Sequence, residues 1–273
     1  MDVLNLQELT LAVYDVARQA GAFIRQERSH FSAASVERKH AHDYVSYVDK
    51  QSEKLIVGKL QELLPQAVFI TEEGTVSSAA DHPVADEQLC WVIDPLDGTT
   101  NFIHRFAPYA VSIALMRGTD ILLGVVYEVC ADECFYAWLG GGSYADGQPL
   151  HVGQSAIDDA LLCLQLPYNS QAYKPVIQQL INHFYGRASS VRMLGSAAIA
   201  LCYVAAGRLD AYVEKYIGQW DYMAGALIVA EAGGRVTNFE GSPQFTQGDS
   251  IVATNSVVHD EMLQALATCC QGN

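Results

Sequence analysis

The alternation of strand-like and helix-like segments beyond residue 160 constrains the fold of this chain more than any other feature. Apolar runs that favour strands lie at residues 160–165, 188–191 and 209–213, and segments that favour helices lie at 175–184, 196–206 and 221–232. Strands that alternate with helices form layered structures in which the helices pack over a sheet. We therefore expect an α/β arrangement in the second half of the chain, residues 151–273.

The first half, residues 1–150, shows a different pattern. Apolar residues recur every three or four positions from 6 to 28, which predicts an amphipathic helix. A second helix is expected from Asp49, a candidate N-cap, to Leu64, because Pro65 then stops it. Short strand-like runs follow at residues 67–70, 89–93, 110–116, 121–129 and 133–138. Because these runs lie close together in the sequence, they predict hairpins and an antiparallel sheet.

The composition is that of a well-buried acidic protein. Half of the 273 residues are hydrophobic and 17% are charged, which excludes a disordered chain. The 16 Lys and Arg residues are outnumbered by 31 Asp and Glu residues, so the formal net charge is −15. Binding to nucleic acid needs a basic surface that displaces counterions from phosphates, so direct nucleic-acid contact is not expected. An acidic chain is better suited to holding cations.

The sequence shows neither a secretory signal nor a membrane span. The N-terminal residues lack the positive charge and apolar core of a signal peptide. The longest uncharged apolar stretch, residues 106–116, is about half the length that crosses a bilayer. The seven cysteines have no paired CxxC spacing of the kind that marks zinc or redox sites. We expect a cytoplasmic protein with reduced thiols and no membrane contact.

The segment WVIDPLDGTTNF, residues 91–102, carries the strongest chemical signal. An apolar strand ends at Asp94, Asp97 follows three positions later, and Gly98 precedes the start of a short helix. Glycine lets a backbone approach a phosphate, and the free N–H groups of a helix start face an anion. Two acids beside an anion would repel it unless metal cations lay between them. Locally, the pattern is equally compatible with Asp97 as a turn former and helix cap.

Two further segments place acids at the ends of apolar elements. The strand-like run VFIT ends in Glu72 and Glu73, and Asp221 begins the apolar helix WDYMAGA. Taken singly, the two glutamates are also compatible with solvated loop charges, and Asp221 with a simple N-cap. Acids at three such ends favour a shared site.

These segments resemble the signatures of the inositol monophosphatase family of magnesium-dependent, lithium-sensitive phosphatases. IDPLDGTTNF, residues 93–102, is similar to the first signature, and WD at 220–221 through EAGG at 231–234 is similar to the second. GSAA at 195–198 and AYVE at 211–214 also match in order and spacing. The resemblance covers nearly the whole chain. It implies a layered αβαβα sandwich, often a homodimer, with the active site between the two halves.

The resemblance also implies roles for individual residues. The implied metal ligands are Glu72, Asp94, the carbonyl of Leu96, Asp97 and Asp221. The implied substrate contacts are Asp97, Gly98, Thr99, Gly195, Ser196, Ala197, Glu214 and Asp221. Glu72 also counts among the implied catalytic residues, together with Asp49 and Thr99, which pair to orient the attacking water.

The chemistry of these residues agrees with magnesium. All of the candidate ligands are oxygens, which selects a hard cation such as Mg²⁺ rather than zinc. Four carboxylates and a phosphate dianion carry a charge of about −6, which two or three Mg²⁺ ions would largely or fully balance. Such ions activate water and stabilise both oxygens of an in-line displacement.

The leading hypothesis is therefore Mg²⁺-dependent hydrolysis of a small phosphate monoester, with inositol 1-phosphate as the first candidate. Other substrates of the superfamily remain open: 3′-phosphoadenosine 5′-phosphate, histidinol phosphate, fructose 1,6-bisphosphate or a nucleotide phosphate. A second class of function is a non-catalytic role as a protein-binding partner, since some relatives are thought to act in transcription complexes. A metal-binding protein without either function is a third possibility.

Overall fold

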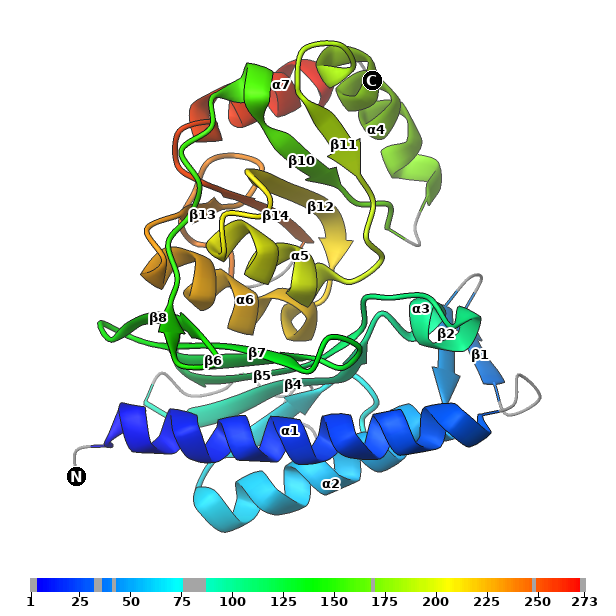
Figure 1. Cartoon of the computed structure of the whole chain (residues 1–273), viewed down its shortest axis with the longest axis vertical. Helices are drawn as coiled ribbons and strands as arrows, with labels where there is room; N and C mark the ends of the chain where they lie inside the picture. Colours follow the sequence, from blue (N-terminus) through cyan, green and yellow to red (C-terminus); the bar gives the residue numbers. More distant parts are fainter. Residues whose placement is uncertain are drawn as a thin grey trace.

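Two sheets alternate with three layers of helices (Figure 1). The computed structural model describes residues 4–31, 36–40, 43–75, 87–167, 170–246 and 249–270. In the view of Figure 1, α1 and α2 lie below a first sheet, α5 and α6 separate it from a second sheet, and α4 and α7 lie above. This is the five-layer αβαβα sandwich that the resemblance implied.

The first helical layer is formed by α1 (Leu6–His30) and α2 (Tyr47–Leu63), which follows the small hairpin of β1 (Val36–His40) and β2 (Asp43–Ser46). The prediction that Asp49 is the N-cap of the second helix is wrong. Ser46 is the N-cap, and its hydroxyl accepts from the N–H of Val48 at 3.1 Å. Asp49 lies one turn inside the helix, and its Oδ2 accepts from the N–H of Ser46 at 2.8 Å. The two residues thus form a capping box.

The first sheet contains seven strands in sequence order. They are β3 (Val68–Thr71), β4 (Leu89–Asp97), β5 (Ala110–Arg117), β6 (Asp120–Glu128), β7 (Glu133–Trp138), β8 (Gly142–Ala145) and β9 (Gln148–Pro149). The predicted hairpins are present from β4 to β9, where every neighbouring pair is antiparallel. The exception is β3, which pairs parallel with β4. Its carboxyl end therefore lies beside the end of β4 that carries Asp94.

The second sheet has the strand order β11-β10-β12-β14-β13. Its strands are β10 (Leu161–Leu164), β11 (Ser190–Arg192), β12 (Ala211–Ile217), β13 (Arg235–Thr237) and β14 (Asp249–Thr254). β10 pairs parallel with β11 and β12, whereas β14 pairs antiparallel with β12 and β13. Parallel pairing aligns the carboxyl ends of β10 and β12 on one edge of the sheet.

The helices of the second half are α4 (Ser170–Phe184), α5 (Ala197–Ala205), α6 (Gln219–Glu231) and α7 (His259–Cys270). The short helices α3 (Thr99–His104) and η3 (Ile157–Asp159) complete the described elements. The prediction that a helix begins at Pro175 is wrong, because α4 begins at Ser170 and contains this proline. A proline in the second turn removes one backbone hydrogen bond, and here it does not end the helix.

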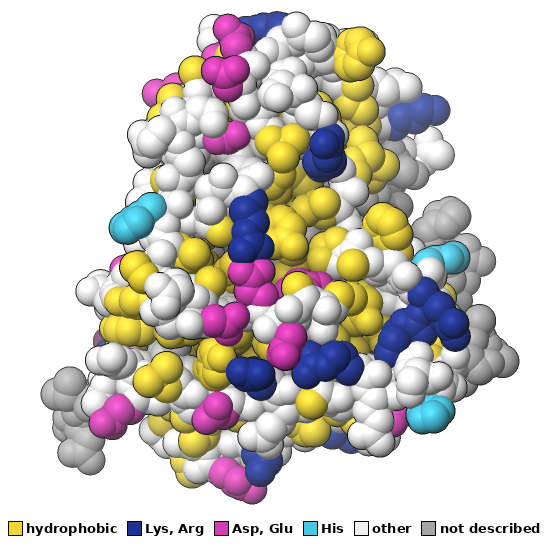
Figure 2. All heavy atoms as spheres, viewed as in Figure 1, with side chains coloured by type: hydrophobic (Ala, Val, Ile, Leu, Met, Phe, Trp, Pro, Cys, Tyr) yellow, Lys and Arg dark blue, Asp and Glu magenta, His cyan; other side chains and the backbone are white. Residues whose placement is uncertain are grey.

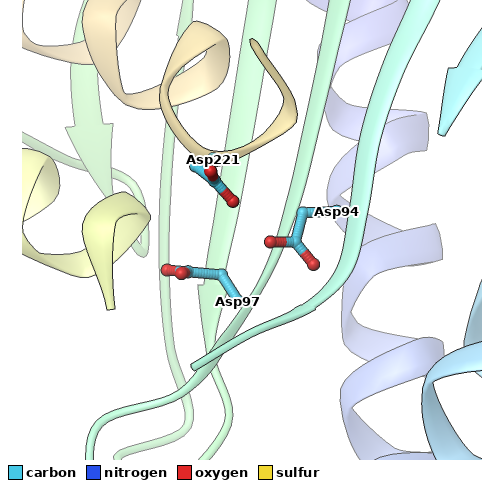
Figure 3. A group of neighbouring side chains, drawn as sticks. All are labelled: Asp94, Asp97 and Asp221. Carbon is cyan, nitrogen blue, oxygen red and sulfur yellow. The ribbon is translucent and has the colours of Figure 1, made fainter. Parts of the chain in front are cut away.

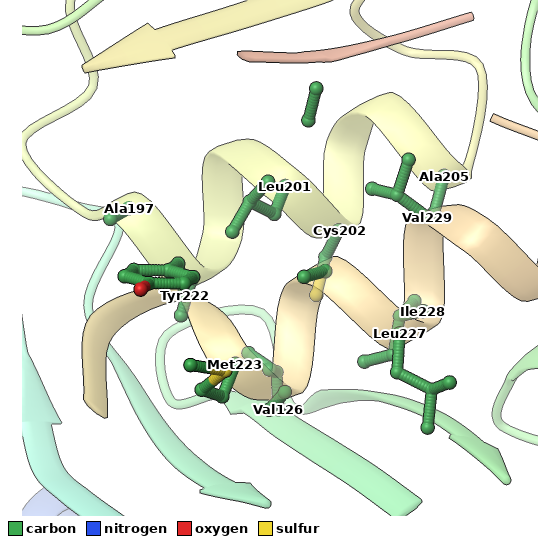
Figure 4. Close-up of a cluster of buried hydrophobic side chains, with 14 of the residues drawn as sticks. Val126, Ala197, Leu201, Cys202, Ala205, Tyr222, Met223, Leu227, Ile228 and Val229 are labelled. Carbon is green, nitrogen blue, oxygen red and sulfur yellow. The ribbon is translucent and has the colours of Figure 1, made fainter. Parts of the chain in front are cut away.

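The main core lies between the two sheets, where most side chains of α5 and α6 are buried (Figure 4). Gly124 of β6 shows how closely α6 approaches the first sheet. A Cβ at this position would lie 2.5 Å from the carbonyl oxygen of Ala224, so only glycine fits. Helices of the second half thus pack directly on the first sheet. The division of the chain into two domains at residue 150 stays a prediction.

Charged side chains of both signs lie next to one another on the surface drawn in Figure 2. Arg18 contacts Asp132 at 3.4 Å, and Arg208 contacts Glu133 at 2.5 Å. Acidic and basic side chains therefore lie close together at both of these places. Among the described helices, none is long and apolar enough to cross a membrane.

His259, the first residue of α7, is fully buried between two threonines. Its Nε2 lies 3.0 Å from the hydroxyl of Thr237, which itself donates to the carbonyl of Asn238. Its Nδ1 lies 2.9 Å from the hydroxyl of Thr254. Thr237 therefore accepts from Nε2–H and Thr254 donates to Nδ1, which fixes a neutral imidazole. Burial, with a smaller contribution from Arg235, lowers the pKa of His259 to about 4.

We expect the free energy of unfolding to fall as the pH drops from 6.5 towards 4, because the unfolded histidine takes up a proton that the folded one does not. A difference of two to three pKa units corresponds to a loss of about 3 kcal/mol. Urea unfolding at several pH values would measure it for the protein and for His259→Gln, whose amide cannot be protonated. If both show the same pH dependence, His259 does not cause it.

Candidate active site

Three aspartates converge at the edge between the two sheets (Figure 3). Asp94 and Asp97 come from the end of β4, and Asp221 comes from the first turn of α6. Carboxylate oxygens of the three residues lie within 4.8 Å of one another, and Asp94 is only 1% exposed. Three acids at this distance form a cluster that could hold a cation.

A β-bulge explains why Asp94 and Asp97 point to the same place. Residues three apart on a regular strand point to opposite faces of the sheet. Here the pairing shifts between Asp94, which lies opposite Ser112, and Asp97, which lies opposite Ala110. Pro95 lies inside this irregular stretch and has no N–H to give to the ladder. The bulge therefore turns both carboxylates toward Asp221.

Asp97 is held from the opposite side by the start of α5. Its carboxylate accepts hydrogen bonds from the hydroxyl of Ser196 and from the N–H groups of Ala197 at 3.2 Å and Ala198 at 2.9 Å. Asp97 thus also caps α5, a helix far from it in the sequence, rather than the helix that follows it. The N-cap of α6 is Gly218, so the N-cap alternative for Asp221 is wrong, and Asp221 lies one turn inside the helix. Its Oδ2 accepts from the N–H of Gly218 at 2.9 Å, while its carboxylate also belongs to the cluster.

Glu72 lies next to the three aspartates, directly after β3. Its N–H donates to the carbonyl of Ile93 at 3.1 Å, which keeps the residue beside Asp94. Burial, followed by the charges of Glu72, Asp97 and Asp221, raises the pKa of Asp94 well above its usual value. Burial also raises the pKa of Asp97 to about 6, although the hydrogen bonds from α5 oppose this shift. Carboxylates so close together remain ionised only when cations compensate them.

Sequence reasoning missed Glu53, which anchors the segment that carries Glu72. The Glu53 side chain is fully buried and accepts from the N–H of Glu73 at 2.8 Å and the N–H of Thr75 at 2.7 Å. The only local sequence feature that could have indicated this role of Glu53 was its position, one helical turn after Asp49. A buried carboxylate that pairs with backbone N–H groups fixes the loop after β3.

The structure brings Asp49 and Thr99 together, as the resemblance implied. The Oγ1 of Thr99 lies 2.9 Å from Oδ1 of Asp49 and 3.0 Å from the carbonyl oxygen of Leu96. Both side chains are buried, and burial raises the pKa of Asp49 against the opposing hydrogen bonds from Ser46. Asp49 also holds the capping box of α2, so it joins the site to the helix beneath it.

A pocket of about 230 Å³ opens beside the cluster. Its lining includes most of the residues expected to contact substrate, namely Asp97, Gly98, Gly195, Ala197, Glu214 and Asp221. Thr99 and Ser196 are not among its lining residues, and both are buried. The lining also contains residues that sequence reasoning missed, namely Thr100, Asn101, Gln165 and Leu166. Gln165 and Leu166 could have been found from their place at the end of a predicted strand.

Glu214 lies in the middle of β12 rather than at a strand end, because β12 continues to Ile217. The residue is 9% exposed, so it is not a solvated surface charge. Burial raises the pKa of Glu214 to about 8, although a hydrogen bond from the hydroxyl of Tyr212 opposes the shift. The pocket therefore has an oriented carboxyl group in its wall.

Comparison with known proteins gives a consistent result. The chain matches the inositol monophosphatase family over residues 5–271. It is 37% identical over 257 residues to the Nus factor SuhB of Salmonella typhimurium, covering 93% of this chain and 94% of that protein. It is 35% identical over 252 residues to the inositol-1-monophosphatase of Mesorhizobium japonicum, covering 92% of each.

Solved structures show the same likeness. The chain matches the extragenic suppressor protein suhB of Bartonella henselae with a TM-score of 0.86 and 31% identity, covering 95% of this chain and 98% of that one. It matches the Thermotoga maritima IMPase with a TM-score of 0.85 and 28% identity, covering 97% and 98%. Fold and site thus define a phosphatase of this superfamily. The chain belongs to the inositol monophosphatase family.

Proposed function

We propose that the protein is a Mg²⁺-dependent phosphatase whose principal substrate is inositol 1-phosphate. The observation that carries the proposal is the convergence of Asp94, Asp97 and Asp221 beside a pocket that Glu214 also lines. The cluster fits a hard cation, because it is buried, acidic and made only of oxygens. The proposed ligands are Glu72, Asp94, the carbonyl of Leu96, Asp97 and Asp221.

When bound, two or three Mg²⁺ ions would neutralise the phosphate and lower the pKa of a water molecule. The chain itself positions the reactants. Asp49 accepts a hydrogen bond from the hydroxyl of Thr99, so a lone pair of Thr99 can orient the attacking water. The backbone N–H groups of Gly98 and Thr99 bind phosphate oxygens, and Glu214 accepts a hydrogen bond from a substrate hydroxyl.

The test is phosphate release from a panel of substrates with Mg²⁺ and with EDTA. The panel holds inositol 1-phosphate, 3′-phosphoadenosine 5′-phosphate, histidinol phosphate, fructose 1,6-bisphosphate and a nucleoside monophosphate. We expect inositol 1-phosphate to have the highest kcat/KM, and EDTA to abolish activity until Mg²⁺ is restored. Full turnover in EDTA would contradict the metal assignment, and a higher kcat/KM for another substrate would replace inositol 1-phosphate.

A protein-binding role is the second candidate, because some relatives carry the name Nus factor SuhB. It is favoured only if the whole panel fails, since a pure binding protein has no need of a buried cluster of like charges.

We also propose a cytoplasmic homodimer. Two exposed apolar side chains are available for the interface, because Phe106 is 62% exposed and Met193 is 44% exposed. Asn101 links the segments that carry them by donating to the carbonyls of Pro108 and Leu194. Light scattering would give the mass in solution.

A further inference from the structure

Gln165 lies beside Glu214 in the wall of the pocket. It follows β10, and its N–H donates to the carbonyl of Val213 at 3.0 Å. Because β10 and β12 are parallel with Leu164 opposite Val213, Gln165 lies level with Glu214. Residues level on parallel neighbours point to the same face of a sheet, about 5 Å apart. Both residues line the pocket.

The orientation of the Gln165 amide follows from its one hydrogen bond. The N–H of Gly195 lies 3.3 Å from Oε1 of Gln165. A backbone N–H can only donate, so the amide oxygen must face Gly195 and the NH₂ group must face away. Among the residues that the structure describes, no group accepts a hydrogen bond from this Nε2. Both N–H donors of the Gln165 amide are therefore without an acceptor among the described residues, at the pocket that this residue lines.

The partner of this amide is itself fixed. Gly195 has a φ of +73°, and a Cβ there would lie 2.9 Å from Oδ1 of Asn101. Asn101 in turn donates to the carbonyls of Pro108 and Leu194, each at 2.8 Å. Gly195 thus has little freedom to move, and Gln165 is held in one orientation.

Glu214 provides the complementary group. Tyr212 donates its hydroxyl to Oε2 of Glu214, which orients the carboxyl group and leaves Oε1 available. The wall therefore presents a carboxyl oxygen of Glu214 next to the Nε2 donor of Gln165. Two adjacent hydroxyl groups of a polyol, each able to donate and accept, match this pair.

We propose that Gln165 is a specificity-determining residue that donates a hydrogen bond from Nε2 to a substrate hydroxyl adjacent to the one bound by Glu214. The proposal rests on the phosphatase function proposed above. It narrows the substrate to a polyol monophosphate with neighbouring hydroxyl groups and disfavours aryl phosphates, which lack them.

The test is the substitution Gln165→Glu, which keeps an acceptor for the N–H of Gly195 and replaces the free donor by an acceptor. kcat/KM is measured with Mg²⁺ for inositol 1-phosphate and for p-nitrophenyl phosphate. A new negative charge would affect both phosphates, so the ratio of the two values is the readout. We expect kcat/KM for inositol 1-phosphate, divided by that for p-nitrophenyl phosphate, to fall about ten- to hundredfold, as for a binding group left without its partner. The matched control is Gln264→Glu on the exposed side of α7, which should leave the ratio unchanged.

Monodeoxy analogues of inositol phosphate provide an independent test. For the analogue that lacks the hydroxyl bound by Gln165, the unsubstituted protein should already show the reduced kcat/KM. Gln165→Glu should then cause little further loss, because the contact is already missing. Equal losses on both substrates, or additive losses with every analogue, would overturn the role of Gln165 and leave the phosphatase function intact. Failure of the unsubstituted protein to hydrolyse either phosphate would overturn the proposed function, and this inference with it.

Discussion

Asp94→Asn is expected to lower kcat/KM for inositol 1-phosphate by about 10³-fold or more. Asp94 is the most enclosed acid of the cluster and the one whose pKa is raised by all three neighbouring acids. Replacing its carboxylate by an amide removes one negative charge where cations are proposed to bind. A loss of about 4 kcal/mol of transition-state stabilisation corresponds to this factor. Steady-state kinetics over a range of Mg²⁺ concentrations would measure it.

The same substitution is expected to stabilise the protein when EDTA is present. Without cations, the buried carboxylate of Asp94 faces the like charges of Glu72, Asp97 and Asp221. Asparagine keeps its shape and an oxygen for the N–H of Leu96 without the repulsion. Thermal unfolding in EDTA should therefore give a higher Tm for Asp94→Asn. The matched control is Asp132→Asn, which removes an exposed charge outside the pocket and should leave kcat/KM unchanged. A less stable Asp94→Asn protein would show that Asp94 supports the fold rather than a cation.

Thr99→Ala is expected to lower kcat by about 10²- to 10⁴-fold with little change in KM, the range for groups that act on the proton of a nucleophile. The hydroxyl of Thr99 lies between Asp49 and the carbonyl of Leu96, and alanine leaves no group to orient water. Thr99→Ser keeps the hydroxyl and should retain most of the activity. Equal losses for alanine and serine would show that the methyl group of Thr99 matters, and not its hydroxyl.

Asp49→Asn is expected to affect both catalysis and stability. Asp49 accepts from the N–H of Ser46 and from its hydroxyl, at 2.8 Å and 2.6 Å, so it also caps α2. The loss of a helix cap costs about 1 kcal/mol of stability. A fall in both Tm and kcat is therefore expected for Asp49→Asn, whereas Thr99→Ala should affect kcat alone.

The sequence was most informative where chemistry and local structure coincide. The apolar run before Asp94 predicted β4, and the acids at its end identified the site. The orientation of Asp97 could not be predicted, because it depends on the bulge after Asp94 and on N–H groups of α5 about a hundred residues later. Regular periodicity would have placed the two acids on opposite faces.

Long-range pairing explains the other differences. Glu53 has the pattern of a helix charge, and its function emerges only where it meets Glu73, twenty residues later. The strand that carries Glu214 extends beyond its apolar run because β14 pairs with it. Strand β14 itself and helix α7 were not predicted at all, and both lie beyond the last segment that showed clear periodicity. Local patterns thus identified most elements but not the contacts that bury polar residues between them.

The position of Asp97 means that the site forms only when distant parts of the chain have packed together. This residue belongs to a strand of the first sheet, yet its carboxylate caps α5 of the second half through Ala197 and Ala198. A chain that has completed only its first 150 residues carries Asp97 without the N–H groups of α5 that orient it. Catalytic competence should therefore arise late in folding, when α5 packs against the first sheet. A slight separation of the halves is expected to silence the enzyme while both sheets keep their hydrogen bonds.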